Sequence, residues 1–238
     1  NRILVDQMSD FNIASDAEAI SNLKSDGLKQ NIYQAANTAY SAANHMLKEL
    51  DETHTTFYPF RLMTIHRAEN ADNPHRLLKI WQLATLLASE MPLIWVMHPR
   101  TLPQLQKLLK TKINVEKKIK QKDLKEPKLL FLSPQRYQKF FHLLCNCQSI
   151  YSDSGGIVDE SVFLGKPYIC LRSETEQHDV VKKKRMLLLS PELSLEHLLQ
   201  KSKSFERMKY PVLSIKEKTY FLQAPSLIIS KILKVFNQ

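Results

Sequence analysis

The sequence predicts an α/β fold built on a Rossmann-like, doubly wound parallel sheet, with helices covering both faces of the sheet. Short apolar runs alternate with amphipathic segments over residues 60–191. The apolar runs are nearly continuous, which is typical of parallel strands buried on both faces, whereas half-exposed strands alternate apolar with polar residues. In a sheet with this repeated strand–helix order, ligands bind beyond the carboxyl ends of the strands.

The individual elements follow from the periodicity of the apolar residues. Strands are expected at residues 61–65, 93–97, 128–132, 149–152, 168–171 and 186–189. Helices are expected between them at residues 74–91, 102–109, 136–146 and 156–164. In the first of these helices, Leu77, Trp81 and Ala84 recur at the 3.6-residue period that places them on one face.

The chain outside this sheet is expected to belong to a second α/β unit. Helices at residues 2–10, 16–25 and 38–50 and strands at 11–14 and 32–35 are too few to close a sheet of their own. The predicted division is a remnant of one domain at 1–50, a linker at 51–57, the main domain at 58–205 and a C-terminal segment at 206–238. From Pro225 onward that last segment has the spacing of an amphipathic helix, which must pack against another part of the protein.

The composition excludes several classes of protein. Apolar residues make up 43% of the 238 residues and charged residues 24%, which is typical of a folded chain and not of a disordered one. No apolar run approaches the roughly 18 residues that a membrane-spanning helix needs, so no membrane partner is expected. The first residues do not form a secretory signal and do not include an initiator methionine, so we expect the chain to begin inside a longer reading frame.

The three cysteines, Cys145, Cys147 and Cys170, lack the number and spacing of a disulfide framework or a zinc site. Buried, reduced thiols are therefore expected, and they indicate a cytoplasmic protein. The sequence offers no other set of metal ligands, so neither a metal nor a cofactor is expected.

The formal net charge of +10 raises the question of nucleic-acid binding. Much of the excess lies in a lysine-rich run at residues 116–128 and in a short cluster at residues 182–185. The run holds six lysines but no aromatic residue on which a base could stack. We expect a solvated connection there and no nucleic-acid partner, although a positive field would also attract a diphosphate ligand.

One candidate site follows the strand at residues 149–152. Gly155 and Gly156 allow an oxygen ligand to approach the backbone closely, and the free N–H groups at the start of the next helix bind anions. Ser154 adds a hydroxyl donor, and Glu160, one turn later, can accept hydrogen bonds from vicinal ribose hydroxyls. The alternative is an ordinary tight turn, but the combination predicts the phosphate and ribose end of a nucleotide-sugar site.

Two further polar clusters follow the ends of strands. His66, Arg67 and Glu69 come after the first strand, where a histidine can exchange a proton near neutral pH and an arginine can bind a phosphate. His98 comes directly after the second strand. The alternatives are a helix N-cap region with a surface ion pair for the first cluster and a structural histidine for the second. Their shared place at the carboxyl edge of the sheet favours a ligand site.

Tyr137 and Phe140 open the helix that precedes the Gly-Gly strand. Aromatic residues at helical spacing usually face the core. Alternatively, their rings form a wall for the nucleotide base.

In this order the motifs resemble the non-hydrolysing UDP-N-acetylglucosamine 2-epimerase family. The family segments T-x-H-R-x-E-N, H-P-R-T, Y-x-x-F, S/T-D-S-G-G-x-x-E-E and L-G-K-P match residues 64–70, 98–101, 137–140, 152–160 and 164–167, except that Asp159 replaces the first glutamate of the E-E pair. The last three agree in spacing without gaps, and residues 1–30 also fit the family pattern. The resemblance implies a GT-B-type fold of two Rossmann-like domains, of which this chain holds the C-terminal, UDP-binding domain and the end of the N-terminal domain.

The resemblance also implies a reaction. Members interconvert UDP-GlcNAc and UDP-ManNAc by eliminating UDP to leave a 2-acetamidoglucal and adding UDP back with the opposite configuration at C2. The carboxylates that move the C2 proton lie in the family's N-terminal domain, and the last of them directly precedes the Asn-Arg that opens this chain. UDP or these UDP-sugars are the implied ligands, and a homodimer is the implied assembly.

Roles carry over residue by residue on the same resemblance. His66 matches the active-site histidine that assists the departure or return of UDP, while Arg67, Glu69 and His98 match ligand-side or regulatory positions. Further positions match the uracil neighbourhood, the diphosphate cradle and the ribose acceptor, which are Tyr137 and Phe140, then Ser154, Gly155 and Gly156, then Glu160.

The chain departs from the family pattern at three segments. G-N-T-V-I-D-A reads A-N-T-A-Y-S-A at residues 36–42, and T-E-R-P-E reads T-E-Q-H-D at residues 175–179. G-x-x-x-L-V-G reads K-R-M-L-L-L-S at residues 184–190, so both glycines are lost. Because these segments match the interdomain hinge and the rim of the site, the resemblance implies UDP binding more directly than catalysis.

Three other functions compete with the epimerase interpretation. A GT-B glycosyltransferase shares the fold and a ribose-binding glutamate, although the His-Arg-x-Glu-Asn segment favours an epimerase. A non-catalytic nucleotide-sugar-binding protein would be consistent with the departures. A hydrolysing 2-epimerase would release free N-acetylmannosamine, but its members typically carry a shorter serine–glycine signature.

Overall fold

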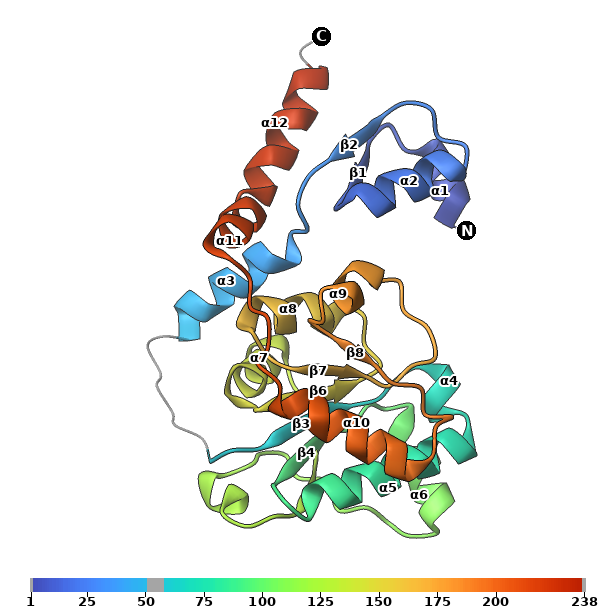
Figure 1. Cartoon of the computed structure of the whole chain (residues 1–238), viewed down its shortest axis with the longest axis vertical. Coiled ribbons are helices and arrows are strands. Elements are labelled where there is room, and N and C mark those ends of the chain that lie inside the picture. The colour runs from blue at the N-terminus through green and yellow to red at the C-terminus, as the bar shows by residue number, and fades with distance from the viewer. Residues whose placement is uncertain (1, 51–57, 237–238) are drawn as a thin grey trace. The chain divides into compact units, whose positions relative to one another are not determined.

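A computed structural model describes residues 2–50 and 58–236, so the predicted linker at 51–57 lies outside the described residues (Figure 1). By their internal contacts the residues form two compact units. Unit 1 combines Asn1–Glu49 with Leu213–Gln238, and unit 2 is Leu50–Val212. The predicted division into a domain remnant, a linker, a main domain and a C-terminal segment, with boundaries at 50, 57 and 205, stays a prediction.

Within the described residues of unit 2, six strands form a parallel sheet in the order β5-β4-β3-β6-β7-β8. The strands are β3 Arg61–Thr64, β4 Leu93–Val96, β5 Leu129–Leu132, β6 Ser149–Ser152, β7 Tyr168–Cys170 and β8 Leu187–Leu188. The chain moves outward from β3 to β5, then returns to the other side of β3 and continues through β6 to β8. The predicted parallel, doubly wound sheet is therefore confirmed, and its topological switch point lies between β3 and β6.

Helices cover both faces of this sheet, as the right-handed crossovers of parallel strands require (Figure 1). The longer ones are α5 Pro74–Ala88, α6 Thr101–Leu109, α7 Tyr137–Asn146, α8 Gly156–Leu164 and α10 Leu195–Arg207. The shorter ones are α4 Ala68–Ala71, α9 His178–Lys182 and the 3-10 helix η1 Gln121–Leu124. Figure 1 shows α5, α6 and α10 on one side of the strands and α7 and α8 on the other.

The start and end of α5 have local causes. The Asn73 side chain accepts hydrogen bonds from the His75 and Arg76 amides, and Pro74 occupies the first turn, where its missing N–H costs nothing. The helix ends at Ala88 and not at the predicted residue 91. Pro92 disfavours the helical conformation of Met91, which argues against a helix that reaches the predicted end.

Helix α10 has no counterpart in the sequence-based prediction. The Ser194 hydroxyl caps its first turn by accepting from the His197 amide, and Leu198, Ser202 and Phe205 form its buried face. Its sequence is rich in lysine and glutamate, so the apolar stripe is narrow and easily overlooked. This helix closes one face of the sheet beside α5.

A buried polar cluster fastens α10 to the amino end of the central strands. The Arg61 guanidinium donates two 2.9 Å hydrogen bonds to Glu206, and the Ser149 and Tyr151 hydroxyls donate to the same carboxylate. Burial opposes ionisation of Glu206, but the bonds from Arg61 and Ser149 outweigh it and lower the pKa of the carboxyl.

Unit 1 contains α1 Arg2–Met8, β1 Asn12–Ala14, α2 Ala17–Ser25, β2 Ile32–Gln34, α3 Ala39–Leu50, α11 Ile215–Leu222 and α12 Ala224–Phe236. Strands β1 and β2 pair in parallel. The Tyr40 ring stacks on Phe221 at 4.0 Å, and the Ser41 hydroxyl donates to the Phe221 carbonyl. These contacts hold α11 on α3, while the predicted return of the final helix to the N-terminal domain stays a prediction.

The structure tests two expectations about solvent exposure, one for the cysteines and one for the lysine-rich run. Cys147 and Cys170 are buried, Cys145 is half-buried, and all three are free thiols. The six lysines of residues 116–128 are all exposed. In the part of the chain that the structure describes, no helix has both the length and the apolar character needed to span a bilayer.

Candidate functional site

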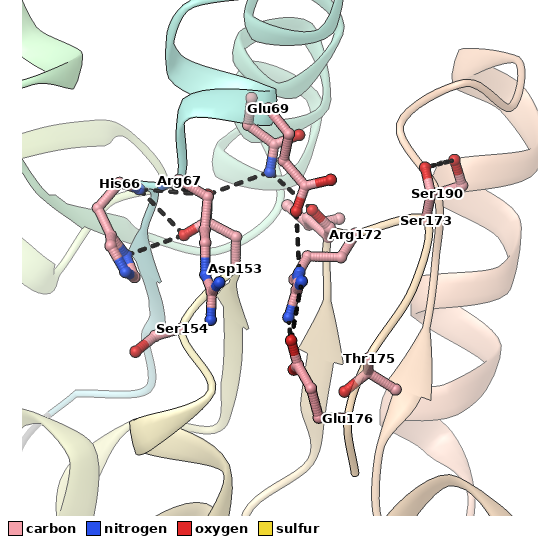
Figure 2. Close-up of polar contacts among 12 residues, drawn as sticks. His66, Arg67, Glu69, Asp153, Ser154, Arg172, Ser173, Thr175, Glu176 and Ser190 are labelled. Atoms are coloured by element: carbon pink, nitrogen blue, oxygen red, sulfur yellow. Dashed lines mark hydrogen bonds and ion pairs between the residues drawn. The ribbon is translucent and has the colours of Figure 1, made fainter. Parts of the chain in front are cut away.

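The candidate site lies at the switch point, where the loops after β3 and β6 meet. Both strands end at the same edge of the sheet, because Thr64 pairs in register with Ser152. Asp153, the residue after β6, and His66, two residues after the end of β3, therefore face each other across that edge (Figure 2). The parallel pairing explains how residues 87 positions apart come into contact.

Asp153 connects the two loops through a fully buried carboxylate. It accepts hydrogen bonds from the backbone amides of His66 (3.0 Å) and Arg67 (2.9 Å). It also accepts from the Asn70 amide at 3.1 Å and lies 3.0 Å from His66 Nδ1. Burial would raise the pKa of Asp153, but the bonds from His66 and Asn70 outweigh it, so the pKa is lowered and the carboxylate is ionised at neutral pH.

A pocket of about 480 Å³ opens beside this contact. It is lined by residues from the ends of two strands, from four loops and from two helices, which are Thr64, His66, Val96, Met97, His98, Pro134, Gln135, Tyr137, Phe140, Ser154, Gly156, Ile157 and Glu160. Its volume suits one small organic ligand. The structure thus brings together most of the residues that were singled out from the sequence.

Tyr137 and Glu160 form one wall of the pocket. The Tyr137 hydroxyl donates to Glu160 Oε1 at 2.7 Å, which joins the start of α7 to α8. Burial raises the pKa of Glu160, and the hydrogen bond from Tyr137 offsets part of that rise. Phe140 lines the pocket one turn along, while the neighbouring Phe141 fills the core. The two predicted aromatic residues therefore face the pocket, and Phe141 takes the core position.

The two glycines start α8 with ordinary helical backbone, since neither has a positive φ. A Cβ added at Gly156 would meet no protein atom within 4 Å. Neither backbone conformation nor crowding within the protein therefore explains glycine there. The predicted close approach of a ligand to the backbone N–H groups at the helix start stays a prediction.

Gly155 is bounded by two side chains. A Cβ at Gly155 would lie 3.7 Å from the Arg67 guanidinium, so this cation lies beside the glycine loop. Arg67 Nε is buried without a hydrogen-bond partner among the described residues. From the other side, Gln177 Nε2 donates to the Gly155 carbonyl at 3.1 Å. Gln177 stands at a position where the family pattern has arginine, and here it restrains the loop by a neutral hydrogen bond.

Glu69 lies away from the pocket, in an ion-pair network that Figure 2 shows in part. Its carboxylate accepts from Arg172 at 2.8 Å and from Arg76 at 3.2 Å. Arg172 also pairs with Glu176, and Arg76 with Glu192. Glu69 therefore ties together the loops that follow β3, β7 and β8, and among the described contacts it faces arginines and not the pocket.

His98 lies at the mouth of the pocket, with its ring centre 5.6 Å from that of His66. Partial burial and the neighbouring His66 lower the pKa of His98, so the ring is neutral at pH 7. Its Nδ1 accepts from the Arg100 amide at 3.2 Å. This leaves Nε2 as the ring nitrogen that can meet a ligand.

Two residues of the site lie in the quoted motifs but were given no role from the sequence. Asp153 lies inside the quoted glycine motif. Its position in the sequence, next to the predicted phosphate-binding residues, does not show that its carboxylate is buried and contacts four donor groups. Asn70 is fully buried and donates to both Asp153 and the Leu171 carbonyl (2.8 Å). A polar residue at the start of a short helix gives no signal of burial. Among the described residues no cluster of histidine, cysteine and carboxylate side chains could hold a metal.

Comparison with known proteins gives consistent matches. A family model described as UDP-N-acetylglucosamine 2-epimerase matches residues 1–227. A UDP-N-acetylglucosamine 2-epimerase of Methanocaldococcus jannaschii is 32% identical over 195 residues, which cover 76% of this chain and 50% of that protein. A UDP-2,3-diacetamido-2,3-dideoxy-D-glucuronate 2-epimerase of Pseudomonas aeruginosa is 30% identical over 188 residues, covering 76% of this chain and 49% of that protein.

A solved structure agrees with these relatives. The crystal structure of Methanocaldococcus jannaschii UDP-GlcNAc 2-epimerase in complex with UDP-GlcNAc and UDP has a TM-score of 0.75 and 26% identity, over 99% of this chain and 64% of that chain. The present chain thus spans about half the length of the curated relatives it matches.

Proposed function

Because the chain belongs to the UDP-N-acetylglucosamine 2-epimerase family, we propose that its pocket binds the UDP part of a UDP-2-acetamido sugar and that the whole protein epimerises this sugar at C2. The observation that carries the proposal is the meeting of His66, Ser154, Gly156 and Glu160 around one cavity at the switch point. These groups come from two segments that are far apart in the sequence, and they suit the parts of a nucleoside diphosphate.

Each part of UDP has a matching set of groups. The N–H groups at the start of α8 and the Ser154 hydroxyl suit the diphosphate, with the Arg67 guanidinium beside Gly155 adding positive charge. Glu160 can accept from the ribose hydroxyls, and the rings of Tyr137 and Phe140 offer a surface for uracil. These assignments are part of the proposal.

In the proposed mechanism, the groups that bind UDP and the groups that move the C2 proton are different residues. A base removes the C2 proton, the electron pair forms the C1–C2 double bond, and the C1–O bond to the diphosphate breaks. His66 protonates the departing diphosphate oxygen. When UDP is added back to C1, these steps run in reverse, and C2 receives its proton with the opposite configuration. Glu160 is the carboxylate among the described pocket-lining residues, and it is bonded to Tyr137. We therefore assign the C2 acids and bases to residues outside this pocket.

The sugar itself is proposed as UDP-GlcNAc, interconverted with UDP-ManNAc. The Methanocaldococcus jannaschii relative is named for UDP-N-acetylglucosamine, whereas the Pseudomonas aeruginosa relative is named for a diacetamido glucuronate. Both names describe inversion at C2 of a UDP-sugar. The substituents at C3 and C6 are therefore the point on which substrates within this family differ.

Titration calorimetry with UDP tests the binding proposal on this chain. Glu160→Ala should weaken UDP binding by about tenfold to a hundredfold, the loss expected for hydrogen bonds to a charged group of about 1.5–3 kcal/mol. Glu196→Ala, an exposed carboxylate on α10, is the matched control and should bind as the wild type does. Absence of any binding heat in the wild-type chain would contradict the assignment of the pocket.

Product analysis tests the reaction with a chain of the relatives' full length. In D2O, the proposed mechanism yields UDP-ManNAc from UDP-GlcNAc with deuterium at C2. Free N-acetylmannosamine would indicate a hydrolysing enzyme, and transfer of the sugar to an acceptor without inversion would indicate a glycosyltransferase. UDP binding without turnover would indicate a non-catalytic nucleotide-sugar-binding protein.

Two further proposals concern the setting of the protein. The free thiols of Cys145, Cys147 and Cys170 support a cytoplasmic location, where cysteines stay reduced. A homodimer rests on the family resemblance alone. Sedimentation velocity of the full-length protein, with and without UDP-GlcNAc, is the measurement that tests it.

A further inference from the structure

We propose that Asp153 is the positioning residue of His66, holding the imidazole in the tautomer that carries its proton on Nδ1 and presents Nε2 to the pocket. The contact itself does not depend on the identity of the ligand. Its catalytic consequence rests on the proposed function, because it assumes a leaving group bound in this pocket.

The geometry requires His66 Nδ1 to be the donor. A carboxylate is an acceptor only, and this one lies 3.0 Å from Nδ1 while accepting two backbone amides and the Asn70 amide. An unprotonated Nδ1 would place its lone pair against a buried negative charge. The neutral imidazole therefore carries its proton on Nδ1, and Nε2 is left as the free ring nitrogen.

Asn70 secures the orientation of this carboxylate. Its Nδ2 donates both to Asp153 (3.1 Å) and to the Leu171 carbonyl (2.8 Å). Exchanging the amide oxygen and nitrogen would direct an oxygen at two acceptors, so the assigned orientation is the one that the contacts allow. Asp153 is thus held between the loops after β3, β6 and β7, and its oxygens cannot turn away from His66.

The consequence is a directed proton path. His66 lines the pocket with a side chain that is one-third exposed, and the structure gives its Nε2 no hydrogen-bond partner among the described residues. When Nε2 is protonated, it can donate that proton to a diphosphate oxygen as the C1–O bond breaks, and the Nδ1–H tautomer remains. On the reverse step Nε2 takes the proton back, and the Asp153 charge stabilises the imidazolium that forms.

Asp153 also has a structural role, since it anchors the backbone of His66 and Arg67. A loss of binding in a variant would therefore not separate positioning from folding. The imidazole tautomer does separate them, because loop anchoring alone does not decide which ring nitrogen carries the proton.

Long-range ¹H–¹⁵N correlation spectra of the ¹⁵N-labelled chain report the tautomer directly. The His66 signals are assigned by their loss in His66→Gln. We expect the wild type at neutral to mildly alkaline pH to show the Nδ1–H pattern for His66. In Asp153→Asn we expect loss of that pattern, because the amide group can donate to Nδ1. His98, whose Nδ1 accepts from the Arg100 amide, is the internal control and should keep the Nε2–H pattern in both proteins.

The outcomes are distinguishable. An Nε2–H pattern for His66 in the folded wild type overturns the proposal, whether or not Asp153→Asn folds. An Nδ1–H pattern that persists in a folded Asp153→Asn also overturns it. UDP titrated into the same wild-type sample tests the proposed function separately, because absence of UDP-induced shifts contradicts the ligand assignment and leaves the tautomer result intact.

Discussion

The Tyr137 hydroxyl donates a 2.7 Å hydrogen bond to Glu160 Oε1, so the residue proposed to bind ribose is already engaged within the protein. Burial raises the pKa of Glu160 and the bond from Tyr137 lowers it, with burial the larger effect. In its ionised state the carboxylate accepts the bond from Tyr137, which a ribose hydroxyl can replace. We therefore expect UDP binding through Glu160 to depend on pH.

UDP affinity should decrease as the pH falls through the Glu160 pKa. The ionised carboxylate accepts from the ribose hydroxyls, whereas protonation removes acceptor capacity. Tyr137→Phe deletes the bond that favours ionisation, so the decrease should occur at higher pH than in the wild type. Calorimetric titrations with UDP across the acidic range measure both midpoints. Glu160→Gln should lack this component of the pH dependence, and an unchanged profile in Glu160→Gln would contradict the assignment.

Gly156→Ala and Gly165→Ala form a matched pair that separates binding from folding. An added methyl at Gly156 meets no protein atom, so stability should change by no more than about 1 kcal/mol. UDP affinity should nevertheless decrease by about tenfold or more, because the methyl blocks an approach worth roughly 1.5–3 kcal/mol.

Gly165 should respond in the opposite way. It ends α8 with φ of 67°, and an added Cβ would lie 3.0 Å from Val212. Alanine there should cost about 1–2 kcal/mol of unfolding free energy in urea denaturation, with little effect on UDP affinity of the folded protein. If Gly156→Ala bound UDP as well as the wild type, ligand approach to the helix start would be the wrong explanation for that glycine.

Glu206→Gln should destabilise unit 2 by about 3 kcal/mol at neutral pH, because it leaves the buried Arg61 guanidinium with only the half-exposed Glu90 carboxylate, 3.8 Å away, as a counter-charge. The folded-state pKa of Glu206 is lowered, so its contribution is present above the unfolded-state pKa and is lost as the pH falls through the folded value. The difference between wild type and variant should therefore shrink in acid.

Urea denaturation at neutral and acidic pH measures this change. The exposed pair of Asp179 and Lys183 provides the control, and Asp179→Asn should stay within about 0.5 kcal/mol of the wild type. An equal loss in the two variants would contradict the structural role of the buried cluster.

Glu69→Gln tests a residue that the motif suggested and the fold placed elsewhere. Because Glu69 contacts Arg172 and Arg76 and does not line the pocket, its substitution should leave UDP affinity within about twofold, a change well below 1.4 kcal/mol. Stability should decrease by roughly 1 kcal/mol, a value kept low because the carboxylate is one-third exposed. A loss of UDP affinity comparable to that of Glu160→Ala would show that Glu69 acts on the ligand.

Much of the fold was predictable because it depends on local pattern. Continuous apolar runs such as residues 93–97 have few alternatives to a buried parallel strand, and all six expected strands formed. Helix α10 was missed because its buried face is Leu198, Ser202 and Phe205 within a highly charged segment. The small helices α4 and α9 were missed because a single turn has no measurable period.

The candidate site was likewise predictable only in part from the sequence. Glycines, a serine and a glutamate at fixed spacing identified the pocket segment from chemistry alone, since few arrangements use that combination. The family pattern also suggested Glu69, but its carboxylate accepts from Arg76 on the next helix and from Arg172, which is 103 residues away. A short motif does not indicate which of its polar side chains turn inward.

The glycine segment could thus be recognised from sequence because backbone approach and helix-terminal N–H groups are properties of a few consecutive residues. The pairing of His66 with Asp153 could not, because it depends on the parallel register of β3 with β6 and on the burial that makes Asp153 an obligatory acceptor. Properties such as backbone approach and free N–H groups at a helix start are determined by residues that are adjacent in the sequence. The partner, charge state and proton position of a side chain are set by groups that only packing brings within 3 Å.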